Sequence, residues 1–208
     1  EGSLGGKARG LAFMNSMILK HRLYDKHANV RIMIPRSVVI ATDYFDDFIR
    51  LNGLKYIISQ EFSDEEILSE FVSSTVPARL QQELKAYIQT VRTPLAVRSS
   101  SKLEDSHYQP FAGIYSTYMI PYVDNGDQML RLLLKAVKSV YASVYFATSR
   151  AYLSSSQNLI SEEKMAVIIQ EVCGTEQDGL FFPTFSGVAR SINYYPIGDE
   201  APADGVCN

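Results

Sequence analysis

One apolar periodicity constrains the fold of this 208-residue sequence more than any other feature. After the turn at 124–127, apolar residues recur at helical spacing: Leu130, Leu133, Leu134, Val137, Val140, Val144 and Tyr145. This period predicts a long amphipathic helix. Its apolar stripe has to be buried, so we expect the helix to cover one face of a β-sheet.

Shorter patterns predict the elements that come before this helix. They are a helix over 8–23, a strand over 38–41, a helix from Thr42 or Asp43 to about 52–53, a short helix after a Ser63/Glu66 capping box, and a helix whose first turn holds Pro77. The first of these helices carries an apolar stripe of Leu11, Met14, Ile18 and Leu19, which should face a core.

Strand patterns dominate the rest of the chain. A buried strand over 95–98 ends in serines 99–101, a second strand covers 114–120, and two more cover 165–172 and 186–195, joined by a Gly- and Phe-rich connection at 174–185. Because helices come early and strands pair late, we predict an α+β fold with mixed or antiparallel sheets and flanking helices. The length fits one domain or two small lobes.

Composition argues against several classes of partner. The formal net charge is -3 and no block of Lys and Arg could follow a nucleic-acid backbone. Cys173 and Cys207 form neither a disulfide framework nor a zinc-type spacing. The longest apolar run, 165–169, is short for a membrane span, and no signal peptide opens the chain. We therefore expect a cytoplasmic protein with no nucleic-acid or membrane partner, and both ends read as cuts within a longer chain.

Two basic segments are candidates for binding phosphate. Gly5 and Gly6 would let the backbone approach an anion beside a helix N-terminus, and Lys7 adds a point charge. The alternative is a flexible turn. Arg98, at the end of a buried strand, is followed by hydroxyls that begin with Ser99 and could form a polar mouth. The alternative there is an arginine paired with Glu104 or Asp105 in a solvated turn.

Two further segments could complete a nucleotide site. The small, glycine-containing stretch 111–117, with Gly113, Ser116 and Thr117, could fold over phosphates, or it could be an ordinary hairpin turn. At the end of an apolar strand, the main chain of 170–172 could read a base edge, or it could be an ordinary strand end.

Several motifs occur in an order that resembles the N-terminal domain of pyruvate phosphate dikinases and phosphoenolpyruvate synthases. They are Gly5-Gly6-Lys7-Ala8-Arg9-Gly10-Leu11-Ala12, Ile34-Pro35 ahead of 38–42, Ala96-Val97-Arg98-Ser99-Ser100-Ser101 with Glu104-Asp105, Phe111-Ala112-Gly113, and Ser186-Gly187-Val188-Ala189. Each piece is common, and the order across most of the chain is the specific signal.

The resemblance implies an ATP-grasp fold, in which two α+β lobes hold ATP between them. Lys7 and Arg98 would contact the phosphates and stabilise charge, next to Gly5, Gly6 and Ser99. By the same resemblance, Gly113, Ser116 and Thr117 would form the phosphate-covering loop, and Gln170, Glu171 and Val172 the hinge that contacts adenine.

The resemblance also implies parts that this sequence does not contain. Residues 1–208 would be one partial nucleotide-binding domain with an incomplete second lobe, inactive alone. Ligands for Mg²⁺ are expected beyond Asn208, as are the phosphohistidine and phosphoenolpyruvate/pyruvate domains of the parent chain. His21, His27 and His107 have no matching context as the phosphate carrier.

Two readings of the parent protein's role remain open besides transfer to a carrier histidine. The acceptor could be an antibiotic, an α-glucan or water, because a nucleotide domain does not name it. The chain could also be a non-catalytic regulatory module that kept the fold. Ala8, Arg9 and the 174–185 connection depart from the family pattern and leave nucleotide affinity open.

Overall fold

The computed structural model describes residues 2–102, 104, 113–155 and 163–208. By their internal contacts these fall into a main unit, Glu1–Val172, and a C-terminal unit, Cys173–Asn208, which are described separately here. The predicted single domain therefore stays a prediction. Asp105, His107 and the Phe111-Ala112 part of the proposed covering loop lie outside the described residues.

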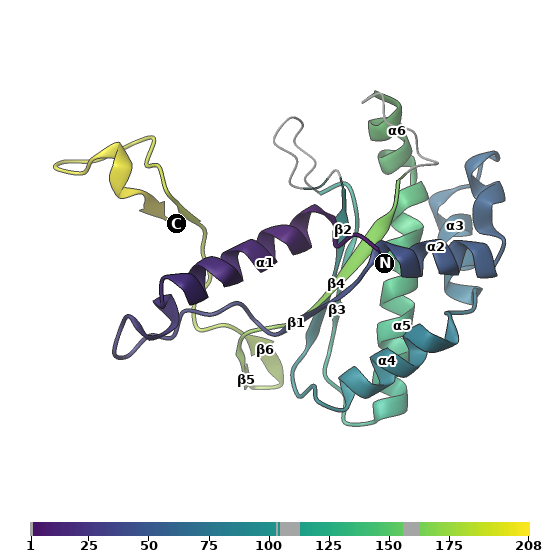
Figure 1. Cartoon of the computed structure of the whole chain (residues 1–208), viewed down its shortest axis with the longest axis horizontal. Helices are drawn as coiled ribbons and strands as arrows, with labels where there is room; N and C mark the ends of the chain where they lie inside the picture. Colours follow the sequence, from purple (N-terminus) through teal and green to yellow (C-terminus); the bar gives the residue numbers. More distant parts are fainter. Residues whose placement is uncertain (1, 103, 105–112, 156–162) are drawn as a thin grey trace. The chain divides into compact units, whose positions relative to one another are not determined.

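A four-stranded antiparallel sheet forms the centre of the main unit (Figure 1). Its strand order is β1 (Ser37–Ile40), β4 (Met165–Glu171), β2 (Leu95–Ser101) and β3 (Thr117–Ile120). Each neighbouring pair is antiparallel, so of the two predicted arrangements, mixed or antiparallel, the sheet has the second. β2 runs on through its serines, whereas the expected strand over 114–120 begins only at Thr117.

Helices cover one face of this sheet (Figure 1). They are α2 (Thr42–Leu51), α3 (Asp64–Ser73), α4 (Ala78–Ile88) and α5 (Gly126–Ala142). Leu133, Val137 and Val140 of α5 are fully buried in the same core as Val97 and Val167 of the sheet. The long helix therefore covers one face of the sheet, as predicted. Every second residue of a strand points to that face, and these residues form the apolar surface against which the helix stripe packs.

Helix α1 (Gly5–Lys20) lies against the other face of the sheet (Figure 1). It begins at the two glycines rather than at residue 8, and its buried residues, Gly5, Gly6 and Ala8, all belong to its first turn. The expected apolar stripe facing a core is wrong at Met14 and Leu19, which are exposed. Only the start of the helix packs closely on β2, so the later residues have no core to face within the described chain.

The other boundaries follow local chemistry. The predicted capping box is confirmed, since the Ser63 hydroxyl accepts from the Glu66 N–H at 3.2 Å and the Ser63 N–H donates to the Glu66 carboxylate at 2.8 Å. Pro77 occupies the residue before α4. The sequence patterns missed α6 (Ala147–Ser155) and the short 3₁₀ turns η1 (Leu23–Asp25), η2 (Leu54–Ile58) and η3 (Ser143–Tyr145).

The C-terminal unit consists of two small hairpins. In the first, β5 (Thr175–Gln177) and β6 (Leu180–Phe182) pair across Asp178 and Gly179, both at positive φ, as a type I′ hairpin turn requires. In the second, β7 (Ala189–Arg190) pairs with β8 (Val206–Cys207) beyond the 3₁₀ turn η5 (Pro202–Asp204). The predicted strand over 186–195 is therefore wrong except at 189–190.

No helix among the described residues is long and apolar enough to cross a membrane.

Lys138 ties α5 to the end of α3, and we expect Lys138→Met to weaken this junction. The Lys138 amine donates to the carbonyl oxygens of Val72 and, at 3.2 Å, of Ser74. Losing two charge-assisted bonds to backbone carbonyls at the end of α3 should cost about 1–2 kcal/mol. Native-state hydrogen exchange at the last turn of α3 would measure this loss. Lys135→Met, on an exposed position of the same helix, is the control, and equal protection in both variants would contradict the assignment.

Candidate functional site

The first turn of α1 is joined to the end of β2 through Ser100. The Ser100 hydroxyl accepts from the Ala8 N–H at 3.0 Å and donates to the Leu4 carbonyl at 2.8 Å. A Cβ on Gly5 would lie 1.7 Å from the Ser100 carbonyl oxygen, and one on Gly6 would lie 1.7 Å from that of Glu104. The glycines are therefore required for close packing of protein backbone. Their approach to an anion stays a prediction.

This packing brings Lys7 to a buried acid. The Lys7 amine contacts the Glu104 carboxylate at 2.5 Å and the Ser99 hydroxyl at 3.2 Å. The Glu104 side chain is only 2% exposed and that of Lys7 25%. Residues 99–101 of β2 pair with β4 only, because β3 begins opposite Arg98. Among the described residues, no strand pairs with this part of β2 on the side that β3 occupies further along.

Glu104 is itself fixed by the strand that precedes it. One carboxylate oxygen accepts from the Ser101 N–H at 2.8 Å and the other from the Ser99 hydroxyl at 2.9 Å. The Glu104 N–H in turn donates to the Ser101 hydroxyl at 3.3 Å. These reciprocal bonds are those of a capping box. The Ser-x-x-Glu spacing of Ser101 and Glu104 is a sequence signal for these bonds that was missed, and Glu104 was considered only as an alternative partner of Arg98.

Arg98 occupies a different environment from Lys7. Its guanidinium donates to the side-chain oxygen of Gln170 at 3.3 Å, and the Gln170 amide donates to the Ser37 hydroxyl at 3.1 Å. Thr117 is opposite Arg98 in the register of β2 and β3. Since directly opposed residues share a face, Thr117, Arg98, Gln170 and Ser37 form a polar row across the sheet face away from the core. This row does not include Ser99, whose side chain alternates to the other face.

The remaining predicted residues are dispersed. Gly113 is exposed at a φ of 74°, and the Ser116 N–H donates to the Ser143 hydroxyl at 3.4 Å. Glu171 pairs with Arg36, and its N–H donates to the Arg36 carbonyl at 2.9 Å. The Val172 N–H donates to the Pro94 carbonyl at 2.9 Å. The proposed hinge is therefore at the end of β4 opposite to the Lys7 pair, and its N–H groups already have protein partners.

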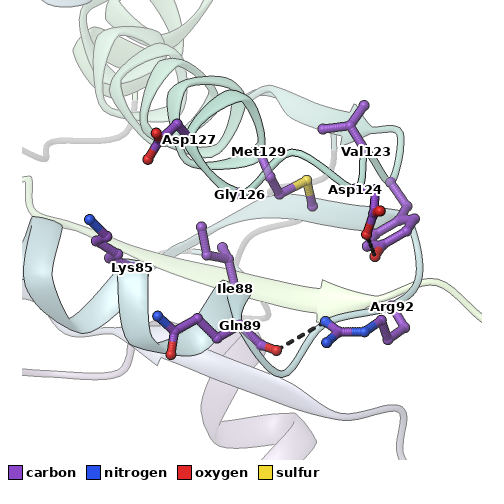
Figure 2. A pocket seen from close by; sticks show the side chains of 10 residues that line it. Lys85, Ile88, Gln89, Arg92, Val123, Asp124, Gly126, Asp127 and Met129 are labelled. Carbon is purple, nitrogen blue, oxygen red and sulfur yellow. Dashed lines mark hydrogen bonds between the residues drawn. The ribbon is translucent and has the colours of Figure 1, made fainter.

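Two of the hollows on the main unit are compared with the predicted site residues. One, of about 370 Å³, lies between α1 and the segment 34–39, and mostly apolar side chains line it, with Ser37 and Arg36 among the polar ones. The other, of about 340 Å³, lies between the end of α4 and the start of α5. Figure 2 shows Ile88 and Met129 facing each other there, with Arg92 bonded to the Gln89 carbonyl at 2.9 Å. Only the first adjoins predicted site residues.

We assign no metal ligand to the residues of this site. Across the described parts of the chain, no group of three His, Cys, Asp or Glu side chains is placed to hold a metal ion. The carboxylate nearest to Lys7 is committed to Lys7, Ser99 and Ser101.

A second buried acid lies near the Lys7 pair. Burial raises the pKa of the Glu163 carboxyl above its usual range, hydrogen bonds from Ser101 and Tyr115 partly oppose this shift, and the charge of Glu104 adds to it. The folded state therefore holds a proton that the unfolded chain releases. Stability from this group is full below the ordinary glutamate pKa of about 4.3 and is lost as the pH rises through the raised pKa.

Gly6→Ala should separate α1 from β2. Its new Cβ would meet backbone rather than a flexible side chain, so the helix must move, at a cost of about 1–3 kcal/mol. Gly10→Ala in the same helix meets nothing within 4 Å and should be neutral or stabilising by about 0.5–1 kcal/mol. Hydrogen exchange of the α1 amides in the full-length protein would compare them. Equal protection of Gly6→Ala and wild type would show that the contact is dispensable.

Glu163→Gln should stabilise the main unit at neutral pH, because it removes the cost of burying an acid that is ionised in the unfolded chain, and the gain should shrink toward pH 4. The measurement is the difference between variant and wild type in amide protection of β2 and β4 at each pH. The exposed Glu61→Gln is the control. A difference for Glu163→Gln that is flat with pH would contradict the burial-driven shift.

Comparison with known proteins identifies the family. The family described as "Pyruvate phosphate dikinase, AMP/ATP-binding domain" matches residues 1–206. An uncharacterized phosphotransferase, YvkC, of Bacillus subtilis is 29% identical over 152 residues, 72% of this chain and 17% of that protein. The phosphoenolpyruvate synthase of Aeropyrum pernix is 24% identical over 200 residues, 86% of this chain and 22% of that protein.

A probable phosphoenolpyruvate synthase of Staphylothermus marinus is 25% identical over 175 residues, 73% of this chain and 20% of that protein. The chain thus spans about a fifth of the length of these relatives. Because the family match covers nearly every residue, this chain belongs to the pyruvate phosphate dikinase AMP/ATP-binding domain family.

Proposed function

We propose that this chain is the ATP-binding part of a phosphotransferase that moves a phosphoryl group from ATP to a carrier histidine elsewhere in its parent protein. The family supports binding of the nucleotide. The relatives' names, a phosphotransferase and two phosphoenolpyruvate synthases, support the reaction class.

The order of polar groups along the sheet carries the proposal. Lys7 is held at the Ser99 level of β2, Arg98 is next along the strand, and Gln170 is bonded to Arg98 from β4. From the Ser99 level to Glu171 the strands cover about 13 Å. ATP is an elongated molecule with its charge at one end. Arg98 in the polar row, and Lys7 held by Ser99 at the next level of β2 outside that row, would supply two cations for this end, and the apolar hollow beside Ser37 would take the other end.

Each end of this row matches the chemistry of one part of ATP. The hollow between α1 and 34–39, with Ser37 in its wall, offers an apolar slot with few polar groups, as an adenine ring needs. We assign Gln170, Glu171 and Val172 to that end. Lys7 and Arg98, with Gly5, Gly6 and Ser99, belong to the phosphate end, and Gly113, Ser116 and Thr117 to a loop that covers the phosphates.

Lys7 and Arg98 would act by charge and position. Phosphoryl transfer asks for little covalent help from protein, and its main requirement is stabilisation of charge on the transferred group. Neither residue is needed as an acid or a base. Magnesium, when bound, would neutralise charge on neighbouring phosphates, and we assign its ligands to the parent chain beyond Asn208.

We further propose that residues 1–208 are part of one ATP-grasp domain whose second lobe continues in the parent. The parent would also carry the phosphohistidine and phosphoenolpyruvate/pyruvate domains. A cytoplasmic location suits the two exposed, unpaired cysteines.

Nucleotide binding by the full-length parent protein tests the assignment. Lys7→Ala and Arg98→Ala should each weaken ATP binding about tenfold or more, because each removes charge-assisted bonds worth about 1.5–3 kcal/mol. Adenosine binding should not change, since adenosine lacks phosphates. Lys20→Ala, at the exposed end of the same helix, is the control. Unchanged ATP affinity in both variants would refute the assigned roles.

The acceptor is tested by the same proteins incubated with radiolabelled ATP. A phosphoenzyme that is labile in acid and stable in alkali, and reduced in yield in Arg98→Ala, is the expected product of transfer to a histidine. Release of free phosphate without labelled protein would instead favour water as acceptor.

A further inference from the structure

We propose that Glu104 is a positioning residue, which holds the Lys7 amine where it can meet a phosphate oxygen of ATP. The inference rests on the proposed function, because it takes Lys7 as a phosphate contact. It adds a residue to which neither the motifs nor the family description assigned any role, and it explains why a buried acid lies beside the lysine.

The geometry of the carboxylate makes it a fixed anchor. Glu104 accepts from the Ser101 N–H at 2.8 Å and from the Ser99 hydroxyl at 2.9 Å, and its side chain is 2% exposed. Rotation of the carboxylate would break bonds to the backbone of β2 and to a fully buried hydroxyl. Of the Lys7–Glu104 pair, the acid is therefore the part tied to the sheet.

Within the part of the chain that the structure describes, the lysine keeps one donor for a ligand. An ammonium group has three N–H donors, and Glu104 and Ser99 receive two of them, at 2.5 and 3.2 Å. The Lys7 side chain retains 25% of its exposure, so the group can still be reached. We assign the third donor to a phosphate oxygen.

Preorganisation is the benefit of this arrangement. A free lysine side chain has many rotamers, and binding a phosphate would have to order them. Here the ordering is done before ATP arrives. The negative charge of Glu104 repels a phosphate, but the Ser99 hydroxyl and the Ser101 N–H also donate to the carboxylate and partly offset this charge. Without Glu104, the Lys7 amine would leave its partly buried position for solvent.

Backbone packing couples the acid to the helix that carries Lys7. The Gly6 Cα lies so close to the Glu104 carbonyl oxygen that a Cβ would approach it to 1.7 Å. The first turn of α1 and Glu104 must therefore shift together. Removal of Lys7 alone would leave a buried, unpaired carboxylate, so Lys7→Ala needs Glu104→Gln beside it to be interpreted.

The test is a double-mutant cycle in the full-length protein, with ATP and adenosine as probes. Glu104→Gln should weaken ATP binding about tenfold, leave adenosine binding unchanged, and have little further effect in a Lys7→Ala background. A purely structural role would weaken both probes and would add to Lys7→Ala. Glu163→Gln is the matched control, because it also removes a buried carboxyl, which bonds to Ser101 and Tyr115 in the same polar cluster. The ATP affinity of this variant should match that of the wild type.

The possible failures are distinguishable. If Lys7→Ala weakens ATP binding but Glu104→Gln leaves it unchanged or tightens it, the positioning role is wrong and the proposed function stands. If neither Lys7→Ala nor Arg98→Ala affects ATP, the proposed function fails and takes this inference with it. Should Glu104→Gln not fold, Glu104→Asp keeps the charge and withdraws it by one methylene; ATP affinity equal to wild type in that variant would overturn the inference.

Discussion

The contact between the first turn of α1 and the end of β2 is the interaction on which the candidate site depends. Two glycines allow the backbones to touch, Ser100 bonds to both Leu4 and Ala8, and the pair of Lys7 and Glu104 closes the junction. These contacts depend on one another, because Lys7 can reach Glu104 only while Gly5 and Gly6, which have no Cβ, let the helix backbone lie against β2 and Glu104. A short polar junction thereby sets the position of the Lys7 charge at the end of β2.

The core was predictable because its signal is local and periodic. The stripe of α5, the buried runs of β2 and β4, and the Ser63 capping box each express one rule within a few residues, and the structure bears them out. The order of the elements predicted mixed or antiparallel sheets, and the central sheet is antiparallel. Arg98 could likewise be singled out, since a guanidinium in a buried strand has to find a polar partner, although the sequence did not reveal that this partner is Gln170.

The errors share a cause, which is that tertiary contact overrides local pattern. Met14 and Leu19 have apolar spacing, yet α1 packs through its first turn and leaves them exposed. Residues 186–195 have strand composition, but β8 supplies only a two-residue partner for Ala189–Arg190. The pairing of Lys7 with Glu104 joins positions 97 residues apart, and no spacing rule reaches so far.

Helix α1 is fastened at its base and not along its length. Its buried residues belong to the first turn, while the helix continues to Lys20, about 24 Å from end to end at the usual rise. The glycine pair is therefore the point at which the helix is held to the sheet. A tilt of roughly 10° at the glycine pair would carry the far end of the helix about 4 Å, so the position of that end depends on how closely the first turn packs on β2.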